Sequence, residues 1–131
     1  MNLKFASYKD FLKTQNALSF EVANQIYELI LSVKQDEDIE LSKLLEELIK
    51  RAVNYADIRS RCLSMSTQEF VRMNATRSQY HDLFIDSVNN LSSYMYKRGY
   101  TEEWRDLLGE NRKCIGDFAC FICYIQSINA R

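Results

Sequence analysis

The sequence contains no proline and only three glycines in 131 residues. Turns of an all-β protein consume both residue types, whereas helix interiors exclude them. The scarcity of both therefore excludes an all-β fold and predicts an all-α protein. The composition, 47% hydrophobic and 27% charged, is that of a globular chain. A chain of this length forms one domain, which we expect to span residues 1–131.

An excess of charge of one sign is also lacking, since 17 basic and 18 acidic residues leave a formal net charge of −1. Proteins that bind nucleic acids or membrane surfaces through general electrostatics carry a basic excess. The arginines of the central part of the chain also fall on several different helix faces. We therefore predict neither a nucleic-acid partner nor a membrane partner.

The chain has a single histidine, His81. Di-iron carboxylate bundles require a Glu-x-x-His motif on each of two helices, and the residue three positions before His81 is Ser78. Zinc sites require closely spaced ligand pairs, and Cys62 and Cys114 are not so placed. Glycine-rich phosphate loops and nucleophile motifs are missing too. We expect no metal and no cofactor, and we favour a function without catalysis.

Long hydrophobic runs are scarce as well. The most apolar stretch, Cys114–Ile128, contains Asp117 and has only about 15 residues, whereas a membrane-spanning helix needs about 20. The first residues, MNLKFASYKD, lack the apolar core of a signal peptide. Four cysteines without an export signal are most simply reduced thiols. These features predict a cytoplasmic protein.

Apolar residues at helical spacing predict four helical arms separated by short connections. Because short connections make successive helices antiparallel, we expect an up-down-up-down four-helix bundle with two long helices. The fourth arm is expected to be broken into a short and a long piece. The expected helices are Phe5–Val33, Ile39–Leu63, Thr67–Arg98 with Ser66 as the N-cap, Glu102–Leu108 and Asn111–Asn129. Ser19 marks a possible break in the first of these, although its apolar phase continues through that residue.

The stretch Cys114–Ile128 is apolar nearly all round when drawn as a helix. Such a helix is either central in a core or covered by a second subunit. Its pair Cys120-x-x-Cys123 resembles a redox motif, but it lies mid-helix among aromatic and aliphatic residues and no sheet is expected. We interpret both cysteines as small core residues.

One polar cluster interrupts the apolar face of the third expected helix. Asn74, Arg77 and His81 are three and four residues apart, so they share that face, and Arg59 of the preceding helix is expected opposite them. Burying such charged groups is unfavourable unless each is paired with an opposite charge or a hydrogen-bond partner. One hypothesis is a carboxylate or phosphate ligand. The alternative is an internal salt-bridge network in which Asp117 or another aspartate supplies the negative charge.

The last third of the chain carries a recognisable local pattern, Trp104-Arg105-x-Leu107-Leu108-Gly109 followed by Arg112-Lys113-x-Ile115-Gly116-Asp117-Phe118-Ala119-Cys120. Over these residues the chain resembles a small bacterial all-helical family of unknown function. The resemblance implies a helical bacterial protein, and it brings no activity, cofactor or catalytic residue to this chain.

The sequence leaves two functional hypotheses open. The first is a regulatory, antitoxin-like or immunity-like bundle that acts by protein–protein interaction or as a homo-oligomer, and it rests on the all-round apolar Cys114–Ile128 stretch. The second is a bundle that binds a small anion, with or without enzymatic activity. The residues expected at that anion site are Arg59, Asn74, Arg77, His81 and Asp117.

Overall fold

The computed structural model describes residues 17–33, 37–62, 65–100 and 103–129, and in these ranges the chain is all-helical. The helices are α2 (Phe20–Ser32), α3 (Ile39–Cys62), α4 (Thr67–Lys97), α5 (Glu103–Leu108) and α6 (Arg112–Asn129). The predicted all-α class is confirmed. No helix among the described residues is both long enough and apolar enough to cross a membrane.

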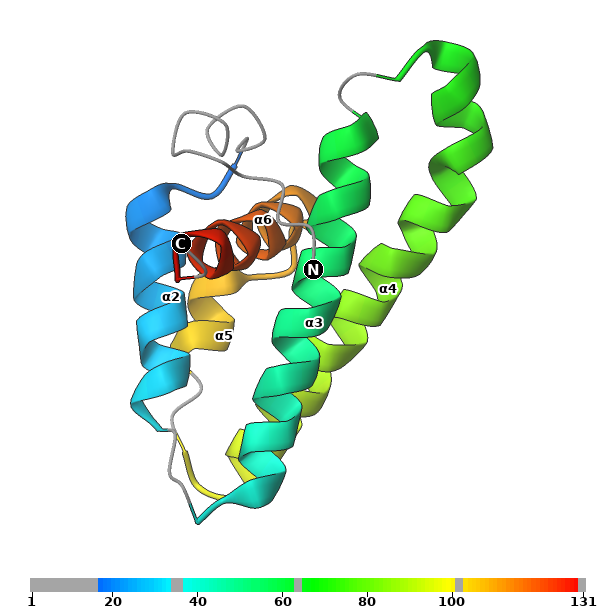
Figure 1. The fold of residues 1–131 in the computed structure, drawn as a ribbon. Coiled ribbons are helices and arrows are strands. Elements are labelled where there is room, and N and C mark those ends of the chain that lie inside the picture. The colour runs from blue at the N-terminus through cyan, green and yellow to red at the C-terminus, as the bar shows by residue number, and fades with distance from the viewer. Residues whose placement is uncertain (1–16, 34–36, 63–64, 101–102, 130–131) are drawn as a thin grey trace.

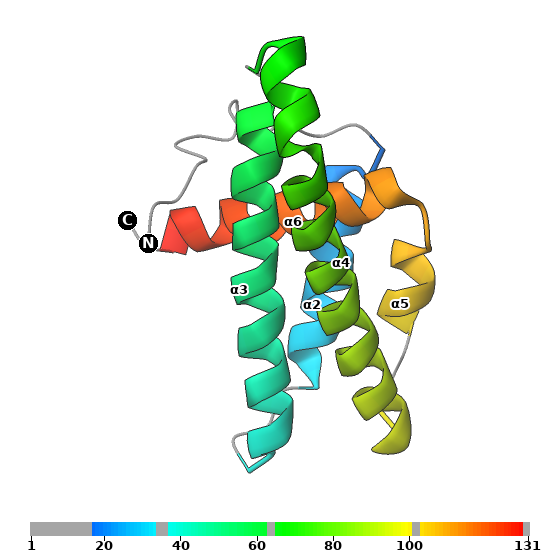
Figure 2. The same cartoon turned by 90° about the vertical axis from the view of Figure 1, so that its right-hand side faces the viewer.

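The helices are arranged around α6 (Figure 1). α3 and α4 lie side by side and run in opposite directions, and α2 with α5 lies on the other side of α6. α6 runs across the α3–α4 pair rather than along it, as the turned view shows (Figure 2). The expected up-down-up-down order is therefore not confirmed, because the longer piece of the fourth arm crosses the other helices.

This crossing explains the apolar character of the last helix. α6 packs against α3 on one side and α2 on the other, and every residue from Ile115 to Tyr124 is buried. Phe20 and Tyr27 of α2 both make edge-to-face contacts with Phe121. The sequence left open whether this helix is central in the core or covered by a second subunit. In the structure it is central, with the chain's own helices on both sides.

The buried residues of α6 include both members of the Cys-x-x-Cys pair. Cys120 and Cys123 are free thiols with 0% exposure. Their interpretation as core residues is confirmed. Among the described residues, no group of three or more histidines, cysteines and acidic residues is placed to hold a metal ion.

The expected single helix from Phe5 to Val33 is wrong. Ser19 has extended backbone angles, and its side chain accepts a hydrogen bond from the Val22 N–H, so it is the N-cap of α2. The apolar phase that runs through this position reflects burial of Leu18 in the core, not a continuous helix. The part of the expected helix from residue 5 to 16 lies outside the described residues.

The predicted ends of α4 are confirmed. Ser66 and Glu69 form a capping box, in which each side chain accepts from the other residue's backbone N–H. Gly99, with φ of 75°, follows the C-cap in the left-handed conformation that glycine adopts without strain. Asn111 plays the capping role for α6, since its side-chain oxygen accepts from the N–H groups of Lys113 and Cys114.

The buried Asp38 fastens the start of α3 to the end of α4. It accepts hydrogen bonds from the Leu41 N–H, the Tyr94 hydroxyl at 2.5 Å and the Tyr100 hydroxyl at 2.9 Å. These donors stabilise the carboxylate, and Tyr94 contributes most. The pKa of Asp38 is consequently lowered from its ordinary value of 3.8.

The lowered pKa predicts acid sensitivity. A carboxyl whose pKa is lower in the folded than in the unfolded protein contributes stability above the unfolded value, and this contribution disappears as the pH falls through the folded value. We expect Asp38→Asn to reduce the melting temperature at pH 7 and to make stability less dependent on pH below about 4. Thermal unfolding of both proteins between pH 3 and pH 7 measures this, and parallel pH curves would contradict it.

Candidate functional site

Asp117 is a charged group buried in the core, with only 1% of its surface exposed. One carboxylate oxygen forms a 2.9 Å ion pair with Arg59 of α3. The other accepts the backbone N–H groups of Ala17 and Leu18, which lie just before α2. The Arg59 guanidinium also contacts the Cys120 thiol at 3.4 Å. The ion pair between Arg59 and Asp117 that the salt-bridge alternative predicted is thus present.

Gly116 makes room for this ion pair. A methyl group at its α-carbon would lie 2.9 Å from Cζ and 3.0 Å from Nε of the Arg59 side chain. Glycine in a helix interior costs about 1 kcal/mol relative to alanine. Glycine is nevertheless required at this position, because the Arg59 guanidinium passes directly over the helix backbone and leaves no space for a side chain.

A cavity of about 290 Å³ opens beside the ion pair, between α3, α4 and the first turn of α6. Its lining carries four cationic side chains and one phenol, and no carboxylate: Tyr55, Arg59, Arg77, Arg112 and Lys113. The start of α6 is brought to α4 by the crossing seen in Figure 2. Residues from three helices therefore concentrate positive charge at one place.

Most of this charge has no protein counterpart. Arg59 is paired with Asp117, but among the described residues no acidic side chain lies within ion-pair distance of Arg77, Arg112 or Lys113. Arg77 donates to the Asn74 side chain at 2.8 Å and lies over the Phe70 ring, while its Nε is buried without a hydrogen-bond partner.

Tyr55 lies beneath these charges. Only 3% of the residue is exposed, and its ring packs against Phe84 and His81. Its hydroxyl forms no hydrogen bond with any described residue. Burial raises the pKa of Tyr55 above 10.0, although the nearby guanidinium groups of Arg59, Arg77 and Arg112 oppose the shift.

His81 lies behind Tyr55 and not in the cavity lining. It is 2% exposed, and its Nδ1 lies 3.4 Å from the Asp82 carboxylate. Burial lowers its pKa below 6.5, and the charges of Arg112 and Arg77 add to this effect. The imidazole is therefore neutral at pH 7.

The structure thus divides the five site residues expected from the sequence. Arg59 and Arg77 line one cavity, Asp117 holds Arg59 from behind, Asn74 is an exposed partner of Arg77, and His81 is a buried neighbour. Tyr55, Arg112 and Lys113 were missed. The adjacent basic pair at the start of the last helix was visible in the sequence, but its position depends on how α6 crosses the bundle.

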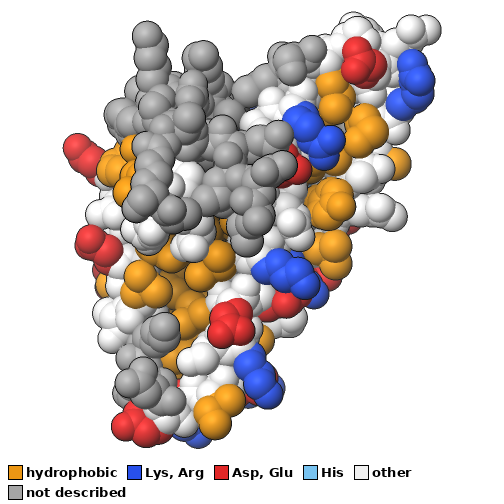
Figure 3. All heavy atoms as spheres, viewed as in Figure 1, with side chains coloured by type: hydrophobic (Ala, Val, Ile, Leu, Met, Phe, Trp, Pro, Cys, Tyr) orange, Lys and Arg blue, Asp and Glu red, His pale blue; other side chains and the backbone are white. Residues whose placement is uncertain are grey.

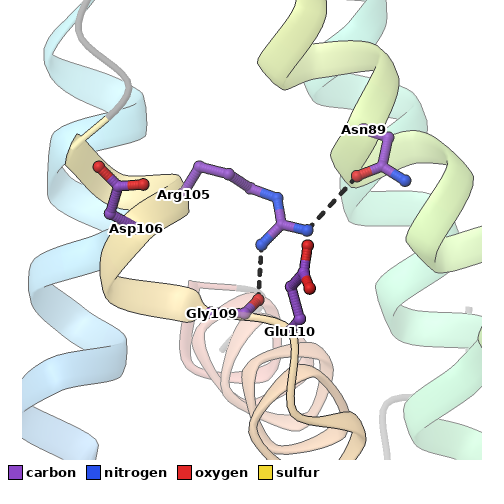
Figure 4. Close-up of a pocket in the computed structure, with 5 residues that line it drawn as sticks. All are labelled: Asn89, Arg105, Asp106, Gly109 and Glu110. Atoms are coloured by element: carbon purple, nitrogen blue, oxygen red, sulfur yellow. Dashed lines mark hydrogen bonds between the residues drawn. The ribbon is translucent and has the colours of Figure 1, made fainter.

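A larger hollow of about 470 Å³ lies between α5 and α4 (Figure 4). Its Arg105 donates hydrogen bonds to the Gly109 carbonyl and the Asn89 side chain, and the carboxylates of Asp106 and Glu110 belong to the same lining. Because its lining has one cation and two carboxylates, this hollow is a weaker candidate for an anion site than the cavity beside Arg59.

Comparisons with protein families, with curated proteins and with solved structures find no match to this chain. The resemblance of the last third to a bacterial helical family gains no support from them.

The contact between Gly116 and Arg59 predicts an unusual response to alanine. Gly116→Ala should destabilise the protein by about 1–3 kcal/mol, because displacing Arg59 weakens a buried ion pair, and breaking such a pair costs roughly 3–5 kcal/mol against the helix gain of about 1. Denaturant unfolding measures the change.

The matched control is the same substitution in an Arg59→Ala, Asp117→Asn background. There we expect it to stabilise the protein by up to about 1 kcal/mol. Equal effects in both backgrounds would show that the guanidinium does not set the requirement for glycine.

Proposed function

We propose that this protein is a non-catalytic binding module for a small oxyanion. The observation that carries the proposal is a cavity lined by four cationic side chains, of which only Arg59 is paired with a carboxylate, that of Asp117 behind the lining. The lining offers no carboxylate or imidazole for proton transfer, so the proposal assigns binding and no chemical step.

Positive charge is concentrated at the cavity although the chain as a whole is nearly neutral. The whole chain carries a net charge of −1, and on the face shown in Figure 3 basic and acidic side chains are interspersed over the described residues. Around the cavity, Arg77, Arg112 and Lys113 repel one another without a compensating acid. An anion relieves this repulsion, and guanidinium groups bind carboxylates and phosphates through charge-assisted hydrogen bonds.

The internal-network hypothesis accounts for only part of the cluster. Asp117 answers Arg59, as that hypothesis expects. Asp117 forms no ion pair with the other three cations, Arg77, Arg112 and Lys113, because its second oxygen accepts the N–H groups of Ala17 and Leu18. The remaining positive charge supports a ligand at the cavity mouth, beside the buried ion pair of Arg59 and Asp117.

The proposal predicts that anions raise the melting temperature, since a ligand that binds only the folded state stabilises it. In Arg112→Gln and Lys113→Gln we expect the affinity to fall at least about tenfold, because a hydrogen bond to a charged group contributes roughly 1.5–3 kcal/mol. Both side chains are exposed, so folding should be retained. Thermal-shift titration with phosphate, sulfate and citrate at constant ionic strength measures this.

Lys50→Gln is the matched control, because Lys50 is an exposed lysine of α3 outside the cavity lining. It should bind like the wild type. No stabilisation by any of the three anions, or an equal loss in the control, would overturn the proposal.

A second candidate function, self-association, is favoured by the tip of the α3–α4 pair. This tip extends beyond α2 and α6 (Figure 1), and α4 has no fully buried residue before His81. Phe70 and Val71 are 38% and 69% exposed. Methionines and charges of both signs lie beside them, a mixture that suits an isologous contact between two copies: Arg61, Met65, Glu69, Arg72 and Met73. The sequence hypothesis of a protein partner rested on the apolar last helix, but in the structure α3 and α2 already cover that helix.

Self-association through this tip predicts a dimer that Val71→Glu dissociates. Placing a like charge from each copy in an apolar contact is unfavourable, so the dissociation constant should rise at least about tenfold. Sedimentation equilibrium of wild type and variant measures it, with Asn90→Glu on the same helix as the control. A monomeric wild type at high concentration would remove this candidate.

A further inference from the structure

We propose that the group held in the basic cavity is a phosphoryl dianion, carried by inorganic phosphate or by a small phosphate monoester. This inference rests on the proposed function, that the cavity binds an oxyanion, and it specifies the chemical class. Three observations lead to it: the charge that the protein leaves unbalanced, the donors that it leaves unsatisfied, and their arrangement on three helices.

The charge favours a dianion over a simple carboxylate. Of the four cations in the lining, only Arg59 is neutralised by the protein. Arg77, Arg112 and Lys113 then present three positive charges to a single ligand. A monocarboxylate would leave two of these charges unbalanced, whereas a dianion leaves one.

The unsatisfied donors require a ligand rich in acceptors. Burying a donor without a partner costs roughly 1–3 kcal/mol. The Arg77 Nε is buried without a hydrogen-bond partner. The Tyr55 hydroxyl lines the cavity and forms no hydrogen bond with any described residue. Arginine and lysine contribute only donors. A group with several acceptor oxygens and no donor of its own satisfies this lining.

The arrangement of the donors favours a tetrahedral group over a planar one. They come from α3 (Tyr55), α4 (Arg77) and α6 (Arg112 and Lys113). The two oxygens of a carboxylate lie in one plane and are met in full by a single arginine fork. The three terminal oxygens of a phosphoryl group diverge, so each can face a donor from a different helix.

The N-terminus of α6 contributes the side chains of Arg112 and Lys113 to this site, but not its backbone N–H groups. The Asn111 side chain already accepts from the N–H groups of Lys113 and Cys114. The cavity volume of about 290 Å³ lies at the lower end of the range for small-molecule sites, which is roughly 300–1,000 Å³. A free phosphate or a short ester is thus of suitable size.

Isothermal titration calorimetry with glycerol 3-phosphate, sulfate and acetate tests this assignment at constant ionic strength. The second pKa of a phosphate ester is about 6, so its dianionic fraction falls about tenfold from pH 8 to pH 5. We expect the affinity for the ester to fall by up to about the same factor, while sulfate, a dianion throughout, serves as the reference. Acetate should bind at least about tenfold more weakly than the ester at pH 8.

The sulfate reference also removes effects of the protein's own titration. The groups around the cavity, namely His81 with Asp82, Tyr55, Arg59 with Asp117, and the outer cations, act on both dianions alike. Tyr55→Phe keeps the packed ring and deletes only the hydroxyl. It should lower the affinity for the ester several-fold at an unchanged melting temperature, whereas Lys50→Gln should leave the affinity unchanged.

The possible outcomes distinguish a failure of the phosphoryl assignment from a failure of the oxyanion-binding function. If acetate binds as tightly as the ester, or if ester and sulfate show the same pH dependence, the phosphoryl assignment is wrong and the oxyanion function stands. If none of the three anions binds, both fail. If binding persists unchanged in Arg112→Gln, the anions bind elsewhere and the assignment to this cavity is overturned.

Discussion

The structure depends on one buried carboxylate. Asp117 lies in the second turn of α6, a helix that is surrounded by others. An ionised group is tolerated there only with a partner and a full set of hydrogen bonds. It has both, from Arg59 on α3 and from the two N–H groups that precede α2. The same side chain therefore joins α6 to α3 and to the start of α2. Gly116 next to it leaves the space through which the guanidinium reaches the pair.

This ion pair also determines what remains available at the surface. Arg59 is 15% exposed, and its charge is balanced from the interior. The cations around it, Arg77 and the basic pair at the start of α6, have no such support and face the cavity. A satisfied network and the proposed binding site are thus two parts of one cluster. The inner part secures the helix crossing, and the outer part offers positive charge to a ligand.

The sequence predicted the helices where local chemistry marks their ends. Ser66 and Glu69 defined the start of α4, and Gly99 defined its end. The prediction was wrong at Ser19, because the apolar phase continues across a genuine cap when the preceding residue, Leu18, is also buried. The expected antiparallel fourth arm was inferred from connection length alone. Periodicity shows which faces of α6 are apolar, but it contains no information on the angle at which α6 crosses α3.

That crossing angle decides the site. Arg59 and Arg77 were predictable because they interrupt the apolar faces of two adjacent helices, whereas Arg112 and Lys113 carried no comparable signal. In an antiparallel fourth arm, the first turn of the last helix would lie at the end of the bundle, and its charges would be solvated like those of any other helix end. Because α6 instead runs across the α3–α4 pair, its first turn lies beside the last turns of α3 and the first half of α4. The cluster of cations is therefore a consequence of the same packing that buries α6 on all sides.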